Sequence, residues 1–236
     1  MAISDRAGIV SGRFRRDATG RIAGIDAGPV RRLRNRRGGP LPQTPFGDSE
    51  GLARGADGAL YVSFEGRHRV WRYTAPGAVP DALPRARAFD TFASNAGLEG
   101  LAVDGAGRLY TLPERADGAF PVYVFDGDRW SQPFDLPVRD GFRAVGLDFD
   151  DRGRLYLLER SFNLIGFTTR VRRFTLEDER VTVEEELLTT GLRTHDNLEG
   201  ISVWRDAAGR LRLTMVADDN FLPVQRTEIV EYTVPG

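Results

Sequence analysis

The stretch Glu50-Gly51-Leu52-Ala53 decides the fold, because it recurs along the chain and a second motif follows it at a constant distance. Ten residues after Glu50 comes Leu60-Tyr61-Val62, and Glu65 follows shortly after. A second copy reads Glu99-Gly100-Leu101-Ala102, then Leu109-Tyr110-Thr111 at the same offset, then Glu114-Arg115. Self-similarity at a fixed period is the sequence signature of repeat architectures. We therefore interpret the chain as a repeat protein.

Further copies are less regular. The third reads Val145-Gly146-Leu147, Leu155-Tyr156-Leu157 and Glu159-Arg160, with Val145 where the other copies have Glu. The fourth reads Glu199-Gly200-Ile201, then Leu211-Arg212-Leu213, then Asp218-Asp219-Asn220. The opening Ile3-Ser4-Asp5-Arg6 matches only the second half of a unit. We expect the chain to begin inside a repeat.

Each unit is predicted to be a small antiparallel sheet. A glycine turn separates its halves, at Gly58, Gly107, Gly153 and Gly209, and tight hairpins favour such turns. Runs rich in β-branched and aromatic residues follow at 69–73, 122–125, 170–174 and 228–234. Residues 177–188 favour strand over helix because of Val181, Thr182 and Val183. Landmarks about 45 to 60 residues apart fit one four-stranded propeller blade per repeat.

The sequence therefore predicts an all-β, single-domain β-propeller of five to six four-stranded blades, with the first blade incomplete. The expected repeat units are approximately 1–40 (partial), 41–90, 91–137, 138–190 and 191–236. The arginine-rich run 31–39 falls between the first two units. Aromatic residues do not interleave with its arginines, so we interpret it as a solvated loop and not as a nucleic-acid patch.

Composition excludes several kinds of chemistry. The chain has 236 residues, no cysteine and only two histidines, and all 33 of its basic residues are arginine. Disulfides, thiolate sites, a Schiff-base lysine and a three-histidine zinc site within one chain are therefore excluded. A formal net charge of −1 gives no field that favours nucleic acid. No apolar stretch approaches the length of a membrane span.

The repeat is predicted to gather acids at one end of the central channel. In a propeller the inner strand and its antiparallel neighbour bring the start of the first and the end of the second to the same face. This places Glu50, Glu99 and Glu199 beside Asp5, Glu65, Glu114, Glu159 and Asp218. Like charges this close need compensation. The available compensators are a hard cation such as Ca²⁺ and the arginines Arg6, Arg67, Arg115 and Arg160.

The fourth complete unit carries extra polar groups. Asn197, Glu199, Asp218 and Asn220 make it the strongest candidate for a metal-binding blade, and Asp48 stands at the same offset before Glu-Gly as Asn197 does. His195 is either a general base or a surface histidine. The alternative for the acids is a set of salt bridges between blades. The glycine after each Glu fits a position where neighbouring backbones approach closely.

Several motifs together resemble a known family. They are Ser4-Asp5-Arg6, Asp48-Ser49-Glu50-Gly51-Leu52-Ala53, Ser63-Phe64-Glu65, Gly97-Leu98-Glu99-Gly100-Leu101, Leu158-Glu159-Arg160, Asp196-Asn197-Leu198-Glu199-Gly200-Ile201 and Asp218-Asp219-Asn220-Phe221. In this order they resemble the phytase-like family, described as having esterase-like activity of phytase, over essentially the whole chain. The resemblance implies a bacterial protein that is periplasmic or secreted when intact. Members usually carry a signal sequence and a Gly/Ser-rich strand upstream, and we expect this chain to be N-terminally truncated.

These observations predict a metal-assisted hydrolase of phosphate or carboxylic esters. Glu50, Glu99, Glu199 and Asp218 would hold Ca²⁺, the arginines would bind a small anionic substrate, and His195 or Glu159 is the candidate for proton transfer. Such a role for calcium is what the resemblance to phytases implies. The alternatives are a gluconolactonase-like metal-dependent lactonase and a non-catalytic propeller that binds a ligand or partner. We expect a monomer that binds neither nucleic acid nor membrane.

Overall fold

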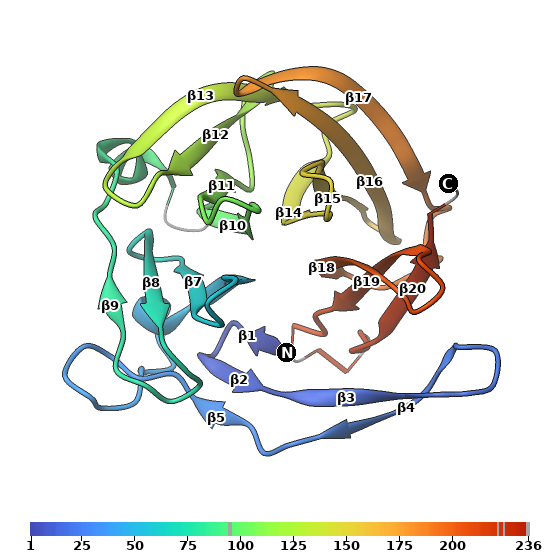
Figure 1. Ribbon diagram of the computed structural model, residues 1–236, viewed down its shortest axis with the longest axis horizontal. Helices are drawn as coiled ribbons and strands as arrows, with labels where there is room; N and C mark the ends of the chain where they lie inside the picture. The colour runs from blue at the N-terminus through green and yellow to red at the C-terminus, as the bar shows by residue number, and fades with distance from the viewer. Residues whose placement is uncertain (94–95, 221, 224, 235–236) are drawn as a thin grey trace.

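A computed structural model describes residues 1–93, 96–220, 222–223 and 225–234; Phe221, the last residue of the matched motifs, lies outside this part. Five small antiparallel sheets are arranged around a common centre as the blades of a propeller (Figure 1). The end of this centre at which the innermost strands of blades two to five begin is called the channel mouth. This confirms the predicted all-β propeller. Among the described residues, no helix is long and apolar enough to cross a membrane.

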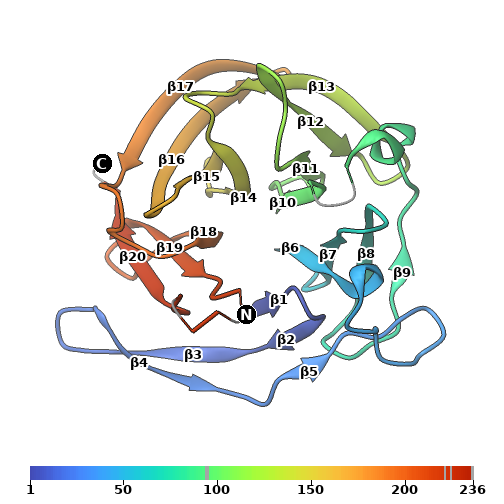
Figure 2. The ribbon, with the colours of Figure 1, turned by 180° about the vertical axis from the view of Figure 1, so that it is seen from behind.

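Blades two to four have four strands each, and blades one and five have three. The first blade pairs β1 (Ala2–Ser4), β2 (Gly8–Val10) and β5 (Arg31–Arg32), and the hairpin β3 (Gly12–Arg16) and β4 (Ile22–Ala27) extends from it alongside the fifth blade (Figure 2). The second consists of β6 (Ser49–Arg54), β7 (Leu60–Phe64), β8 (Arg69–Tyr73) and β9 (Asp81–Ala82). The third consists of β10 (Leu98–Val103), β11 (Leu109–Pro113), β12 (Ala119–Phe125) and β13 (Trp130–Pro137).

The fourth blade consists of β14 (Arg143–Phe149), β15 (Leu155–Asn163), β16 (Gly166–Glu177) and β17 (Arg180–Thr189). The fifth consists of β18 (Leu198–Arg205), β19 (Leu211–Ala217) and β20 (Ile229–Thr233). Two short 3₁₀ helices, η1 (Pro45–Gly47) and η2 (Arg87–Thr91), lie in connections. The predicted strand over 177–188 is thus confirmed, since most of it forms β17.

The hairpin between the first two strands of each complete blade has the turn that the glycines predict. Gly58, Gly107, Gly153 and Gly209 all have positive φ, between 76° and 85°. In blades three to five an aspartate begins the turn, and its Oδ1 accepts hydrogen bonds from two backbone N–H groups of the turn. Such side-chain acceptors fix the turn locally. The register of the inner strands, and of the residues they carry, follows from it.

Apolar clusters hold neighbouring blades together. Between blades three and four, for example, Tyr110 and Phe120 pack with Leu147 and Phe174, all buried. Similar clusters join blades one and two, two and three, and four and five, and close packing of this kind restricts movement of these blades relative to one another.

An ion pair joins the first blade to the last. The Nη1 and Nη2 atoms of Arg16 on β3 donate to the two carboxylate oxygens of Glu231 on β20, at 2.7 and 2.9 Å. The same guanidinium lies 5.0 Å from the centre of the Trp204 ring. The hydrogen bond from Arg16 is the main reason that the pKa of Glu231 falls to about 2. Closure of the ring thus includes a charged, two-pronged contact between side chains.

Candidate functional site at the channel mouth

A β-bulge near the start of the inner strand frees one side chain from the ladder in each of blades two to five; it is a glutamate in three of them, and Val145 of blade four is buried in an apolar cluster. At this point the pairing with the next strand skips two residues in β6 and one in β10, β14 and β18. The skipped residues include Glu50, Glu99, Val145 and Glu199, in that order. A bulge frees a residue from the ladder and redirects its side chain. The repeated Glu therefore occupies the bulge, where its side chain departs from the alternation of the strand.

The glycine after each bulge allows the inner strands to approach one another. A Cβ atom on Gly51 would lie 2.6 Å from Leu101 Cβ and 2.9 Å from the carbonyl oxygen of Glu99. One on Gly146 would lie 3.0 Å from the carbonyl oxygen of Glu199. The predicted close approach of backbones at these glycines is confirmed. It brings the acids of adjacent blades together.

A second set of charged residues follows the end of the neighbouring strand. Equivalent positions are held by Phe64, Pro113, Glu159 and Ala217, since each pairs with the residue before the bulge. Three of them end their strands, and β15 continues beyond Glu159. The residues that come next are Glu65, Glu114, Arg160 and Asp218. Asp5 follows β1 in the same way, because its carbonyl accepts from Ser49 N as that of Glu114 accepts from Ala144 N. Blade four therefore contributes an arginine where the others contribute an acid.

The prediction that Glu159 lies in the channel mouth is wrong. Its side chain is fully buried within blade four, where it accepts hydrogen bonds from Arg170 at 3.0 Å and from Arg172 at 2.7 Å. Successive residues of a strand point to opposite faces, so Arg160 faces the mouth and Glu159 does not. The sequence held the signal, since Glu65 and Glu114 come five residues after the Leu of Leu-Tyr and Glu159 only four.

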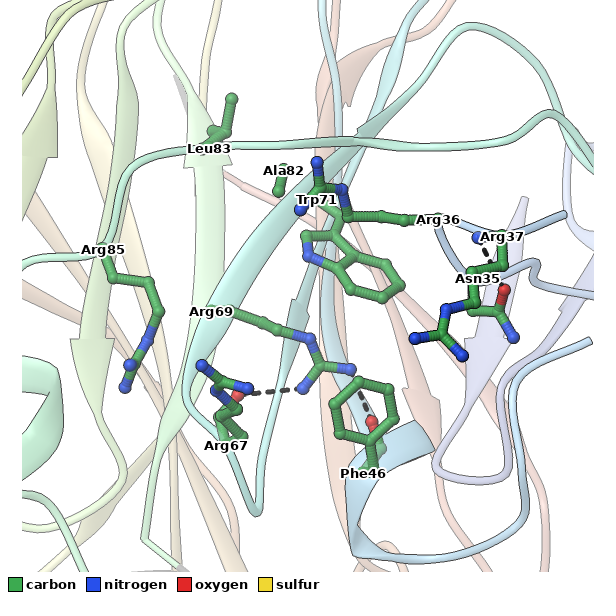
Figure 3. Close-up of a pocket in the computed structure, with 10 residues that line it drawn as sticks. All are labelled: Asn35, Arg36, Arg37, Phe46, Arg67, Arg69, Trp71, Ala82, Leu83 and Arg85. Atoms are coloured by element: carbon green, nitrogen blue, oxygen red, sulfur yellow. Dashed lines mark hydrogen bonds between the residues drawn. The ribbon is translucent and has the colours of Figure 1, made fainter. Parts of the chain in front are cut away.

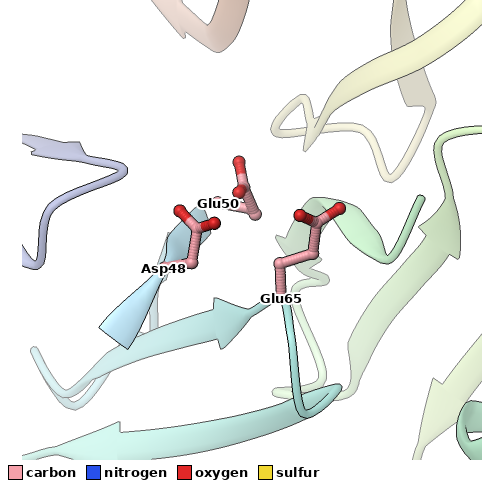
Figure 4. A group of neighbouring side chains, drawn as sticks. All are labelled: Asp48, Glu50 and Glu65. Atoms are coloured by element: carbon pink, nitrogen blue, oxygen red, sulfur yellow. The ribbon is translucent and has the colours of Figure 1, made fainter. Parts of the chain in front are cut away.

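Three carboxylates of the second blade form the tightest acidic group. Asp48, Glu50 and Glu65 each offer an oxygen within 4.8 Å of the others, and their side chains face a common space (Figure 4). Burial, followed by repulsion from Glu99, raises the pKa of Glu50 well above its usual value. The group thus carries an electrostatic cost that a cation would relieve.

The remaining acids extend this group around the mouth. Burial is the main reason that the pKa of Glu99 is well above its usual value, and repulsion from Glu114 and Glu199 adds to it. Burial also raises the pKa of Glu65, even though its Oε1 accepts a hydrogen bond from Gly97 N at 3.2 Å. The bulge glutamates of three blades therefore lie near one another, as the repeat predicts.

Arg160 compensates the acids on the opposite side. Its guanidinium donates to Asn197 Oδ1, to Glu199 Oε1 and, at 3.2 Å, to Glu114 Oε1. The amide of Asn197 also donates to Glu199 Oε1 at 3.0 Å. Burial still raises the pKa of Glu199 to about 7 against the attraction of Arg160. Two of the predicted ligands of blade five, Asn197 and Glu199, are thus engaged by a cation of the protein itself, and the acidic group of blade two is the better metal-binding candidate.

Asp5 completes the circle between the last blade and the second. Its Oδ1 is buried without a hydrogen-bond partner among the residues that the structure describes. After burial, the charge of Asp5 is the largest cause that raises the pKa of Asp48, and it also raises that of Asp218. An orphaned buried carboxylate oxygen in such surroundings fits a site for a cation.

The other predicted site residues have different surroundings. His195 Nε2 lies 2.6 Å from the hydroxyl of Tyr232 on β20, and Asn220 donates to Gln225 in an exposed segment. Neither contact involves the acids of the mouth. Arg115 donates to Glu114 at 2.9 Å. Arg143, which the sequence did not single out, donates to the same carboxylate at 3.4 Å.

Fold and site together define a five-bladed β-propeller with an oxygen-rich, acidic channel mouth, of the kind that suits a hard divalent cation. The chain belongs to the phytase-like family, described by esterase-like activity of phytase, which it matches over residues 1–221. The resemblance found in the sequence motifs is thereby confirmed. No curated protein matches the chain.

Solved structures match the chain at low identity. A nidogen/laminin complex matches with 17% identity and a TM-score of 0.52, covering 96% of this chain and 75% of the other. A protein of unknown function from Dyadobacter fermentans matches with 14% identity and a TM-score of 0.54, covering 83% and 63%. A gluconolactonase from Xanthomonas campestris matches with 19% identity and a TM-score of 0.47, covering 82% and 64%. The first two likenesses bear on the fold alone.

Proposed function

We propose that the channel mouth binds a divalent cation, Ca²⁺ in the first place, and that the chain hydrolyses phosphate or carboxylic esters there. The carrying observation is the group of Asp48, Glu50 and Glu65, with oxygens within 4.8 Å of one another. Ligands on opposite sides of a Ca²⁺ ion lie about 5 Å apart, since each bond is about 2.3 to 2.6 Å long. Membership of a family described by esterase-like activity supports the choice of reaction.

The donor set favours a hard cation. All candidate ligands are carboxylate oxygens, and both histidines have other partners, His68 at the carbonyl of Ala93 and His195 at Tyr232. Oxygen-only sites suit Ca²⁺, Mg²⁺ or Mn²⁺ better than zinc or copper. A cation held there would act as a Lewis acid on the ester.

Residues of the chain itself would supply the other parts of the reaction. Arg115 and Arg143 lie on the rim with half-exposed side chains, and both contact Glu114. Their guanidiniums can bind an anionic substrate beside the acids. Glu199, with a pKa of about 7, is suited to donate or accept a proton near neutral pH. The proposal therefore moves proton transfer from His195 and Glu159 to a glutamate of the mouth.

Calcium titration by calorimetry, combined with hydrolysis assays, tests the proposal. We expect saturable binding to the metal-free protein and a loss of about tenfold or more in affinity for the Asp48→Asn/Glu50→Gln variant. Asp57→Asn is the matched control, because Asp57 is an exposed acid of the same blade that pairs with Arg72.

The assays use aryl phosphates, aryl acetates and sugar lactones, each with and without chelator. Chelator-sensitive hydrolysis of a phosphate or carboxylic ester supports the proposal. Turnover of lactones alone would replace it by a lactonase, and calcium binding without turnover of any substrate would leave a binding protein. No calcium binding at all would refute the metal site.

A further inference from the structure

A cationic pocket lies on the flank of the second blade, outside the acidic mouth. Its cavity of about 550 Å³ is lined by Phe46, Trp71 and the five arginines Arg36, Arg37, Arg67, Arg69 and Arg85, with Asn35, Ala82 and Leu83 (Figure 3). The chain as a whole has a net charge of −1, so this is a local concentration of positive charge. The segment between β7 and β8 contributes to both places, with Glu65 at the mouth and Arg67 in the pocket.

The positive charge of the pocket is largely uncompensated. Arg85 pairs with Asp90 at 2.5 Å. Within the described part of the chain, the other four arginines form no ion pair with a carboxylate. Arg36, Arg37 and Arg67 are exposed to solvent, but Arg69 is buried, and proteins rarely bury a charge without a partner. A missing anion is the simplest way to balance this cluster.

Arg69 is a buried, fixed part of the pocket, which therefore does not consist of mobile surface side chains alone. Its side chain is only 4% exposed, and its guanidinium carbon lies 4.2 Å from the ring centres of Phe46 and Phe64 and 4.5 Å from that of Trp71. The Nη atoms donate to the carbonyls of Arg67 and Phe46. The Nε atom is buried and has no hydrogen-bond partner among the described residues.

Such an environment disfavours the charge of Arg69. Burial, with repulsion from Arg67 and Arg85, lowers its pKa to about 10. Three aromatic faces hold the guanidinium in one orientation and partly stabilise its charge. The cost of placing it here without an acid is offset when an anion occupies the pocket.

We propose that this pocket binds a small, multiply charged oxyanion, such as a molecule with two or more phosphate groups. The volume falls within the range of small-molecule sites. Guanidinium groups match phosphate oxygens in geometry, and several of them around one cavity favour several negative charges over one. The proposal goes beyond the ester hydrolysis at the mouth, since neither a metal nor turnover enters it.

Calorimetric titration of the metal-free protein, in the presence of chelator, with phosphate, pyrophosphate and tripolyphosphate tests the proposal. We expect saturable binding whose affinity rises with the number of phosphate groups and falls with added salt. The Arg36→Gln/Arg37→Gln variant should bind tripolyphosphate about tenfold more weakly or worse. These two arginines are exposed, so the variant should fold normally.

Two controls make the result specific. Arg21→Gln/Arg152→Gln removes the same charge from exposed positions elsewhere and should change the affinity by less than about twofold. Asp48→Asn/Glu50→Gln should leave tripolyphosphate binding intact, which separates this site from the mouth. The proposal is overturned if no saturable binding occurs, if the two arginine variants behave alike, or if only a long polyanion such as heparin binds.

Discussion

Replacing Glu199 by Gln should stabilise the metal-free protein at alkaline pH. Glu199 has a folded-state pKa of about 7, against an ordinary value of 4.5, and burial is the main cause. A group whose pKa is raised by folding contributes its full stability below the unfolded value, and this is lost as pH rises through the folded value. Charged Glu199 is therefore destabilising above about pH 7 in the absence of metal, even though Arg160 touches it.

The magnitude follows from the shift. One pKa unit corresponds to about 1.4 kcal/mol, so the rise from 4.5 to about 7 costs the fold up to about 3 kcal/mol at about pH 8. Gln keeps the shape of the protonated acid and does not titrate. We expect Glu199→Gln to raise the free energy of unfolding by up to about 3 kcal/mol at about pH 8 and by less than about 1 kcal/mol at about pH 5.

Urea denaturation followed by tryptophan fluorescence, on metal-free wild type and variant at both pH values, measures this difference. Burial lowers the pKa of His68, which acts in the opposite direction over this range, but it is common to both proteins and cancels. The exposed control Glu177→Gln should show no pH-dependent difference. Calcium at about a hundred times its dissociation constant should stabilise the wild type by about 2.7 kcal/mol. A variant that is less stable than wild type at about pH 8 would refute the reasoning.

Three further changes have defined outcomes. Glu159→Gln removes the fully buried carboxylate that Arg170 and Arg172 share and leaves them only their outer partners, Asp140 and Glu184, so it should destabilise the protein by about 1 to 3 kcal/mol in denaturant titrations, with calcium affinity unchanged in the folded state; an unchanged stability would contradict the burial argument. Arg160→Gln removes the cation of the mouth and should raise calcium affinity about tenfold by calorimetry, so an equal or lower affinity would show that Arg160 does not oppose the metal. Gly51→Ala places a Cβ 2.6 Å from Leu101 Cβ and should lower stability by about 1 to 3 kcal/mol in thermal unfolding; an unchanged midpoint would mean that the inner strands can move apart freely.

The repeat made the fold accessible from the sequence alone. Its landmarks are strand and turn residues, whose preferences are local, and the predicted run 69–73 coincides with β8. The convergence of Glu50, Glu99 and Glu199 could also be predicted, because equivalent positions of blades lie around one channel. These inferences needed periodicity and not side-chain contacts.

The details of the site depended on register and on contacts between distant segments. One residue of offset decides whether Glu159 or Arg160 faces the mouth. The same blade also has Val145 where the other copies have Glu, so its sequence has no matching acid with which to align the offset. The run 31–39 was interpreted as a solvated loop because aromatic residues do not interleave with its arginines. Packing of the first blade on the second brings Arg36 and Arg37 near Arg67 and Arg69, and no local pattern could show this.

The ion pair between Arg16 and Glu231 has a consequence for how the ring opens. In a toroid each blade is held by two neighbours, so separating one pair of blades leaves every other interface in place. The contact between β3 and β20 joins residues 215 positions apart in the sequence, and among the described residues no strand pairing joins β3 to β20. The side-chain contact between Arg16 and Glu231 therefore closes the ring between blades one and five, and we expect these blades to separate more readily when the Glu231 carboxylate is neutral.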